Sequence, residues 1–299
     1  MNAVAFRLFA LVRCELWQRI RFRRRLGMVA GGAALLGLLG TGFIALFTPV
    51  LGIRIQPGVT APDGAALFMI VGAIGLVIVL IRVLGYFMHA LFDERLDRSI
   101  LFWQSLPVSD TERVAAKTAT GLFAIPLVNW AYTMMIAAIL LFFLSLSTSL
   151  MGHDFWGSFW QPVPLLSVIV FFGVFFPVFM LWLFPVLGWL LFCSAWSSPR
   201  RRRASWSLAI GVPLVLGILE PILTGTHYFG DWVQLLSGPF GRIWHLALLS
   251  IVRWRNPTGA LWATLGWMFT RPEFWLGGLV GLGFSAFALY LLHHHEPPN

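Results

Sequence analysis

The stretch Asp93–Lys117, DERLDRSILFWQSLPVSDTERVAAK, is a charged island between two long apolar runs of the chain. It carries five acidic and four basic residues, in a protein in which only 11% of the residues are charged. Charged side chains are costly in the core of a bilayer. The stretch is therefore predicted to lie outside a membrane and to connect two helices that cross it.

The first part of this stretch has the pattern of an amphipathic helix. Its apolar face would carry Phe92, Leu96, Ile100 and Trp103, and its charged face Asp93, Glu94, Asp97 and Arg98. Glu94 precedes Arg98 by four residues, which is the favourable order for an ion pair within a helix. A short amphipathic helix between two membrane spans most commonly contacts a soluble partner protein.

The second part of the stretch carries the signals of a helix start. Pro107 ends the first helical pattern, because proline cannot donate the backbone hydrogen bond that a helix interior needs. Ser109 is followed three residues later by Glu112, which is the spacing of a capping box. A new helix is therefore predicted to begin there and to run into the membrane.

The composition of the whole chain predicts an all-α integral membrane protein. The chain is 59% hydrophobic, and its mean hydropathy is +0.82. A membrane-spanning helix needs about 20 apolar residues, and several runs reach that length. A transmembrane β-barrel is excluded, since its strands would alternate apolar and polar residues and no such alternation occurs.

Six membrane spans are predicted after an N-terminal amphipathic helix, Met1–Arg25, that rests in the membrane interface. The predicted spans are Leu26–Leu51, Gly64–His89, Thr118–Leu146, Pro164–Trp196, Ser205–Leu223 and Phe274–Leu292. The third and fourth are longer than the hydrocarbon core requires, so they should tilt, kink or project from it. Pro177 and Pro185 are plausible kinks in the fourth. The predicted organisation is thus a helix at 1–25 and a membrane domain at 26–299.

The distribution of basic residues predicts the orientation. The N-terminal helix and the loops at 90–118 and 197–204 hold fifteen Lys and Arg, whereas the opposite side holds five. Because cytoplasmic loops carry the excess of Lys and Arg, both termini are predicted to be cytoplasmic. The net charge of +9 could suggest nucleic-acid binding, but the positive clusters lie beside apolar spans. They fit topology signals and contacts with anionic lipids, and no nucleic-acid partner is expected.

The outer segment 224–272 contains two short apolar runs, Ile243–Val252 and Ala260–Phe269. Each is too short to cross a bilayer alone, so both are predicted to be interfacial or re-entrant helices on the outer face. The alternative is that one run is a true span, which would give seven spans and an external C-terminus. The polar tail His293–Asn299 is predicted to be solvated, although its three histidines could bind metal.

Sequence motifs for catalysis or nucleotide binding are missing from the chain. The only lysine is Lys117, and Ala116 precedes it, so no phosphate-cradling G-x-x-x-x-G-K-[ST] loop is present. No Cys/His cluster has zinc spacing, and no G-x-S-x-G or H-E-x-x-H motif occurs. We therefore expect no catalytic residue, no metal site and no cofactor in this chain.

Three polar residues inside or beside apolar runs are candidates for a translocation path. Asn129 and Tyr132 lie one turn apart on the third span, where they could line a path or form an interhelical hydrogen bond. Glu220, at the outer end of the fifth span, could bind a cation or substrate, or could be a solvated carboxylate at a helix end.

These features together resemble the membrane subunit of an ABC-2 type exporter. The loop text DERLDRSILFWQSLPVSDTE is similar to the family run (D/E)R-x-D-x-S-I-L-F-W-x-S-L-P-V-S-D. Asp93–Leu106 resembles the family's cytoplasmic coupling helix, Met1–Arg25 its connecting helix, and the segment 243–269 its re-entrant helices. The resemblance covers nearly the whole chain.

The resemblance implies a mechanism and a set of partners. Two permease subunits, identical or different, would pair in a bacterial inner membrane and dock on separate ABC ATPase subunits, which bind ATP and Mg²⁺. The ATPase-coupling residues would be Asp93, Glu94, Arg95, Asp97, Arg98 and Trp103. The aromatic, charge-poor interior favours an amphipathic or apolar cargo, for example a drug, peptide or lipid. The alternatives are an intramembrane enzyme, or a membrane anchor or sensor without a transport path.

Overall fold

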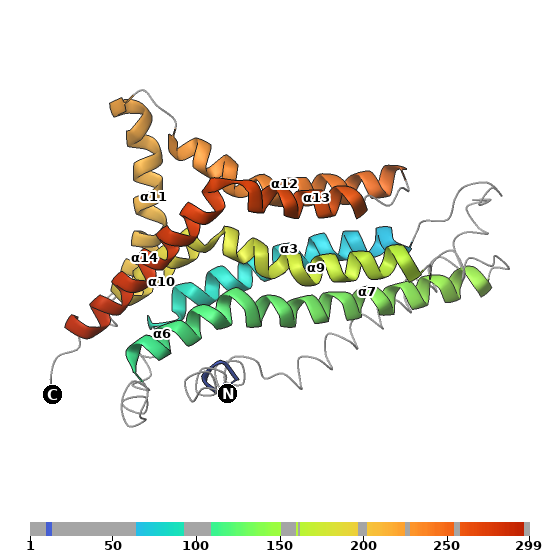
Figure 1. Ribbon diagram of the computed structural model, residues 1–299, viewed down its shortest axis with the longest axis horizontal. Helices are drawn as coiled ribbons and strands as arrows, with labels where there is room; N and C mark the ends of the chain where they lie inside the picture. Colours follow the sequence, from blue (N-terminus) through green and yellow to red (C-terminus); the bar gives the residue numbers. More distant parts are fainter. Residues whose placement is uncertain are drawn as a thin grey trace.

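The computed structural model describes residues 10–13, 64–92, 109–150, 160, 162–196, 202–224, 228–253 and 258–295 (Figure 1). These residues are almost entirely helical, and no strand occurs among them. The prediction of an all-α fold is confirmed to that extent. The predicted first span, most of the N-terminal helix and the predicted coupling helix Asp93–Leu106 lie outside the described residues.

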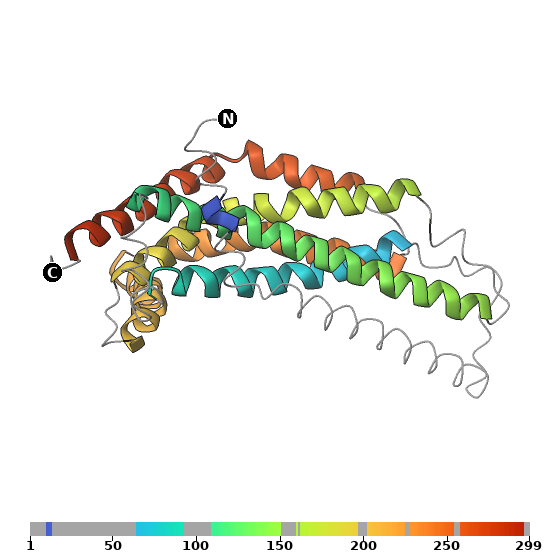
Figure 2. The same cartoon turned by 90° about the horizontal axis from the view of Figure 1, so that it is seen from below.

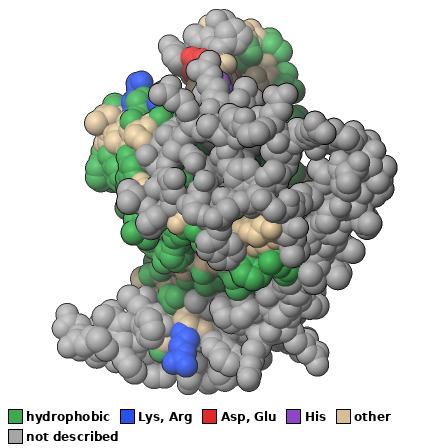
Figure 3. Space-filling model, turned by 90° about the vertical axis from the view of Figure 1, so that its right-hand side faces the viewer, with side chains coloured by type: hydrophobic (Ala, Val, Ile, Leu, Met, Phe, Trp, Pro, Cys, Tyr) green, Lys and Arg blue, Asp and Glu red, His purple; other side chains and the backbone are tan. Residues whose placement is uncertain are grey.

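Four of the described helices are long and apolar enough to cross a membrane. The apolar stretches are Leu67–His89, Asp110–Leu146, Leu165–Trp182 and Pro272–His293. Many of their large apolar side chains are exposed, among them Ile81, Leu166 and Leu279. Hydrophobic side chains also make up most of the coloured surface at the right-hand end of the molecule (Figure 3). This is the surface of a membrane protein, whose outer side chains face hydrocarbon. Six spans remain a prediction.

Helix α3 (Gly64–His89) forms the centre of the bundle. Its ends coincide with the predicted second span, and it contacts α7, α9, α10 and α12. Its 26 residues reach about 39 Å, more than the roughly 30 Å of a hydrocarbon core. Seen from below, α7 lies over α3 and α9 (Figure 2).

The predicted third span is part of one long helical segment with a π-helical turn in it. The segment consists of α6 (Asp110–Ala119), the π-turn η1 (Thr120–Ala124) and α7 (Ile125–Leu150). A helix-interior proline clashes with the carbonyl four residues before it, which for Pro126 is that of Leu122, inside η1. The wider π-turn relieves this clash.

The capping box predicted from Ser109 and Glu112 is present. The Glu112 backbone N–H donates to Ser109 Oγ at 3.2 Å, and the Ser109 N–H donates to Glu112 Oε2 at 3.0 Å. Both groups belong to the first turn of α6, where backbone N–H groups have no partner within the helix. The helix therefore begins where the sequence pattern predicted.

The predicted fourth span is broken near its middle. It consists of α9 (Pro162–Trp182) and α10 (Phe184–Trp196), with Leu183 as a turn between them. Pro185 lacks the N–H that would bond to the Leu181 carbonyl, and the Val186 N–H instead donates to the Leu183 carbonyl at 3.0 Å. The predicted interruption at Pro185 is thus confirmed, whereas α9 continues through Pro177.

The last two helices, like α9 and α10, are separated by a single non-helical residue close to a proline. Helix α13 (Thr258–Thr270) ends at Thr270, and α14 (Pro272–His295) begins after the single non-helical residue Arg271. Proline is well tolerated at the first position of a helix, since its missing N–H would have no helical partner there. Helix α14 covers the predicted sixth span. It extends to His295, so the three histidines of the tail are helical, and His293 is exposed as the predicted solvated end requires.

Two parts of the predicted arrangement differ in the structure. Helix α11 (Arg202–Thr224) covers the predicted fifth span, but it stands steeply away from the bundle (Figure 1) and its apolar stretch is short, Ser207–Ile222. The predicted helix at 243–252 is only the second half of α12 (Tyr228–Arg253). Helix formation extends upstream because apolar residues recur with helical spacing from Tyr228 onwards, despite three glycines and Pro239.

Helices α12 and α13 form a hairpin that lies along the bundle. The two helices contact each other, α12 contacts α3 and α13 contacts α9. The ends that the basic residues assign to the cytoplasm all lie at the left of Figure 1: the end of α3, the start of α6, the ends of α10 and α14, and the start of α11. These ends share one side of the bundle, and the assignment of that side to the cytoplasm stays a prediction.

Helices α10 and α14 make the most extensive helix–helix contact of the described part, and glycines allow it. A Cβ at Gly188 would lie 2.7 Å from the carbonyl oxygen of Gly281. A Cβ at Gly281 would lie 2.6 Å from the Phe184 ring. Small residues at a crossing let two backbones approach closely, which is how helices gain van der Waals contact in a bilayer.

We expect Gly281→Ala to destabilise the protein by about 1–3 kcal/mol, the usual range for overpacking. The Phe184 backbone oxygen would lie 2.8 Å from the new methyl group and cannot move without shifting α10. The matched control is Gly283→Ala on the same helix, where a Cβ meets no atom within 4 Å. Thermal unfolding in mild detergent measures both. Equal midpoints for the two variants would contradict the assigned contact.

Candidate functional site

The candidate coupling segment, residues 93–108, is flanked by two described stretches that attach its ends to the bundle. The predicted coupling residues Asp93, Glu94, Arg95, Asp97, Arg98 and Trp103 lie outside the described part of the chain. The residues immediately before and after the segment are described. They show which helices hold its two ends.

The first attachment point joins the end of α3 to α10. The backbone N–H groups of Leu91 and Phe92 both donate to Ser194 Oγ, at 3.1 and 3.0 Å. All three residues are buried. A buried N–H without a partner is costly, and Ser194 satisfies the N–H groups of two residues that follow the end of α3. Phe92, predicted to lie on the apolar face of the segment, is buried in the bundle.

The second attachment point joins the start of α6 to the end of α14. Asp110, in the first turn of α6, lies 3.1 Å from His293 Nδ1 and 3.4 Å from an Arg113 nitrogen. Arg113 and Lys117, one and two turns into α6, are both buried. The capping box and the Arg113 contact lie within α6, so the contact that joins α6 to α14 is that of Asp110 with His293, at the surface of the protein.

Both ends of the coupling segment are thus attached to one helix pair. Ser194 belongs to α10 and His293 to α14, and these two helices contact each other more extensively than any other described pair. A displacement of the segment would act on α10 and α14 together. Sequence reasoning missed both residues, because a serine in an apolar run and a histidine in a tail carry no signal of their partners.

Asn129 forms an interhelical hydrogen-bond cluster between α3 and α7. Its Nδ2 donates to the Gly75 carbonyl at 3.1 Å, and Arg82 donates to its Oδ1 at 3.3 Å. Thr133 lies one turn further on and its side chain packs so close to Gly75 that a Cβ there would lie 2.5 Å away. Of the two alternatives for Asn129, the structure provides the interhelical hydrogen bond. Its role in a path stays a prediction.

Of the other two path candidates, Tyr132 lies beside this cluster and Glu220 lies on a different helix. Tyr132 is half-buried on α7, one turn from Asn129. Glu220 is on α11, which packs mainly against α10 and α12, whereas α7 packs against α3 and α9. The structure therefore brings Asn129 and Tyr132 together and leaves Glu220 on a separate helix.

A cluster that the sequence did not predict surrounds Trp267 on α13. The guanidinium carbon of Arg242 lies 4.2 Å from the Trp267 ring centroid, and that of Arg271 lies 5.1 Å from it. The Trp182 ring centroid is 5.6 Å from the same ring. Cation–π contacts of this kind stabilise cations near aromatic faces. They tie the α12–α13 hairpin to the break between α13 and α14.

Within the described ranges, no group of three His, Cys, Asp or Glu residues is placed to hold a metal ion. No family model, curated protein or solved structure matches the chain.

We expect Ser194→Ala to destabilise the protein by about 1–3 kcal/mol for each N–H group that it leaves without an acceptor. Ser285→Ala is the matched control, because that buried hydroxyl donates to the Gly281 carbonyl of its own helix at 2.8 Å. Hydrogen exchange at Leu91 and Phe92 with thermal unfolding measures the effect. If Ser194→Ala loses no more stability than Ser285→Ala, the attachment is incorrect.

The contact between Arg82 and Asn129 can be measured by a double-mutant cycle with Arg82→Met and Asn129→Leu. We expect a coupling free energy near 0.6 kcal/mol, the average for polar contacts between membrane helices. Unfolding free energies of the wild type, both single variants and the double variant supply the cycle. Additive effects would mean that the two side chains do not interact.

Proposed function

We propose that the chain is the permease subunit of an ATP-driven ABC-2 type exporter. The observation that supports this most directly is the double attachment of the charged segment 93–108. One end is bonded to α10 through Ser194, and the other is held against α14 through Asp110 and His293. A segment that receives force from a soluble partner must be joined firmly to the helices that move.

In the proposed mechanism, ATP binding closes a dimer of partner ATPase subunits, which also hold the Mg²⁺. The charged residues Asp93, Glu94, Arg95, Asp97 and Arg98 engage a groove of the ATPase, and Trp103 with the apolar face anchors the segment. Closure moves the segment, and the attachments transmit that movement to α10 and α14 as a rigid pair. The interruptions at Leu183 and Arg271 break the helical continuity with α9 and α13, and in this proposal the pair turns at these two points.

Two such subunits, in a homodimer or heterodimer, form the translocation path in this proposal. The cargo is amphipathic or apolar, because the described interior is dominated by aromatic and aliphatic side chains. Asn129, Tyr132 and Glu220 are the polar candidates along the path. The α12–α13 hairpin corresponds to the re-entrant element between the fifth and sixth spans. Both termini face the cytoplasm of a bacterial inner membrane.

The proposal is tested by reversing the charges of Asp97 and Arg98 together, as Asp97→Arg with Arg98→Asp. We expect the double variant to fold normally and to lose export, because the groove of the ATPase no longer matches the segment. The wild-type chain should co-purify from mild detergent with an ABC ATPase, and the variant should not. Transport in vesicles, pull-down with mass spectrometry and ATPase activity are the measurements.

Asp231→Lys provides the control for a change of charge elsewhere. Asp231 is exposed in the first turn of α12, a helix that supplies neither attachment point, so export should continue at the wild-type rate. A wild-type chain that purifies without any ATPase would contradict the proposed function. So would a well-folded Asp97→Arg, Arg98→Asp variant with normal ATP-driven export.

A further inference from the structure

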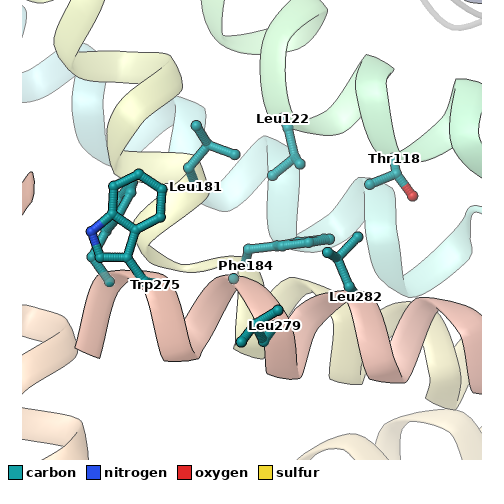
Figure 4. A pocket seen from close by; sticks show the side chains of 9 residues that line it. Thr118, Leu122, Leu181, Phe184, Trp275, Leu279 and Leu282 are labelled. Atoms are coloured by element: carbon teal, nitrogen blue, oxygen red, sulfur yellow. The ribbon is translucent and has the colours of Figure 1, made fainter. Parts of the chain in front are cut away.

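A cavity of about 530 Å³ lies where three helix irregularities meet. It is bordered by the π-turn η1, by the break between α9 and α10, and by the first turns of α14. Its walls include Thr118, Leu122, Leu181, Phe184, Trp275 and Leu279. Figure 4 shows Leu122 and Leu181 on one side, α14 with Trp275 and Leu279 on the other, and the Phe184 ring between them. Ligand cavities in proteins span about 300–1,000 Å³, so this volume can hold a ligand.

The side chains in the walls of the cavity offer no free hydrogen-bond donor. Thr118 Oγ1 already donates to the Val114 carbonyl at 2.9 Å. Trp275 Nε1 already donates to the Phe269 carbonyl at 3.2 Å. The remaining side chains are hydrocarbon. A polar ligand would lose most of its hydrogen bonds to water without replacement, which costs several kcal/mol, so the space favours an apolar group.

The open side of the cavity faces the outer surface of α14. Trp275 is 62% exposed and Leu279 is 65% exposed, on a helix that is long and apolar enough to cross a membrane. The inner walls are closed off, since Leu122 and Phe184 are each only 4% exposed. In a bilayer the medium at such an opening is lipid hydrocarbon, not water.

We propose that this cavity binds an acyl chain of a membrane lipid. A void of this size would forfeit the dispersion contacts of all the side chains around it, and the nearest molecules able to restore them are lipid tails. The chain enters past Trp275 and Leu279 and packs against Phe184 and Leu122. It fills the space that the π-turn and the two helix breaks leave open. The inference depends on the membrane setting and not on the proposed export function.

Two glycines of α14 allow a matched test. Gly278 lines the cavity, and a Cβ at this position meets no atom within 4 Å, so a leucine side chain there can occupy the space. Gly283 lies five residues further along the same helix, and a Cβ there also meets no atom within 4 Å, but it does not line the cavity. Gly278→Leu and Gly283→Leu therefore add the same group to the same helix.

The experiment reconstitutes the full-length chain in nanodiscs that contain a phospholipid with a diazirine near the end of one acyl chain. After illumination, peptide mass spectrometry maps the labelled residues. We expect the wild type to be labelled at the buried residues Leu122 and Phe184, besides freely exposed positions such as Ile81 on α3. Gly278→Leu should reduce the labelling of Leu122 and Phe184 at least fivefold and leave Ile81 unchanged. Gly283→Leu should match the wild type at all three.

The wild-type map alone can overturn the inference. Labelling confined to exposed residues such as Ile81, with none at Leu122 or Phe184, would show that no acyl chain enters. Equal reductions in Gly278→Leu and Gly283→Leu would also overturn it, because the loss would then not depend on filling the cavity. A lipid-labelled chain that co-purifies with no ATPase would sustain this inference and contradict the proposed function.

Discussion

The close approach of Gly188 and Gly281 is the contact on which much of the described bundle depends. Inside a bilayer, apolar side chains gain nothing by leaving lipid for protein, so helices associate through tight van der Waals contact and polar bonds. The two glycines bring the backbones of α10 and α14 close enough for the most extensive helix contact in the described residues. Six residues after Gly188, Ser194 then reaches the end of α3, and the end of α14 reaches Asp110.

Prolines divide the long helices at comparable depths and so shape the space between them. Pro126 follows the π-turn, Pro185 follows the break after α9, and Pro272 begins α14. Each interruption frees a short stretch of backbone from regular helical packing. Because the three interruptions lie side by side, they border an apolar cavity that opens at the surface of α14. The same interruptions break the helical continuity of α10 with α9 and of α14 with α13.

The proposed function and the proposed lipid site use this arrangement in different ways. The exporter proposal needs a helix pair that follows the segment 93–108, and the attachments through Ser194 and His293 supply the connection. The lipid proposal needs only an apolar cavity that opens towards hydrocarbon. An acyl chain in the cavity would contact Leu181, Phe184 and Leu279, which lie at the joint between the moving pair and the rest. Its occupancy would therefore bear on how freely the pair turns.

Local patterns in the sequence were sufficient where the physical cause was local. The apolar run at 64–89 predicted α3 to the residue, Ser109 with Glu112 predicted the start of α6, and Pro185 predicted the break before α10. Hydropathy, capping and the missing proline N–H act within a few residues, so their effects can be predicted from short stretches of the sequence. The predicted short helix at 243–252 was wrong in extent, because its charged and glycine-containing upstream half is also helical.

Contacts between distant residues were decided only by the tertiary structure. Nothing in the sequence around Ser194 indicates that it accepts two bonds from residues more than one hundred positions earlier, and nothing joins His293 to Asp110. The polar residue Asn129 was recognised, but its partners Gly75 and Arg82 were not. The sequence by itself determined that the chain is helical, apolar and punctuated by prolines, since each of these follows from single residues or short windows. The cavity and the attachments of the coupling segment arise from the packing of several helices, so only the tertiary structure could decide them.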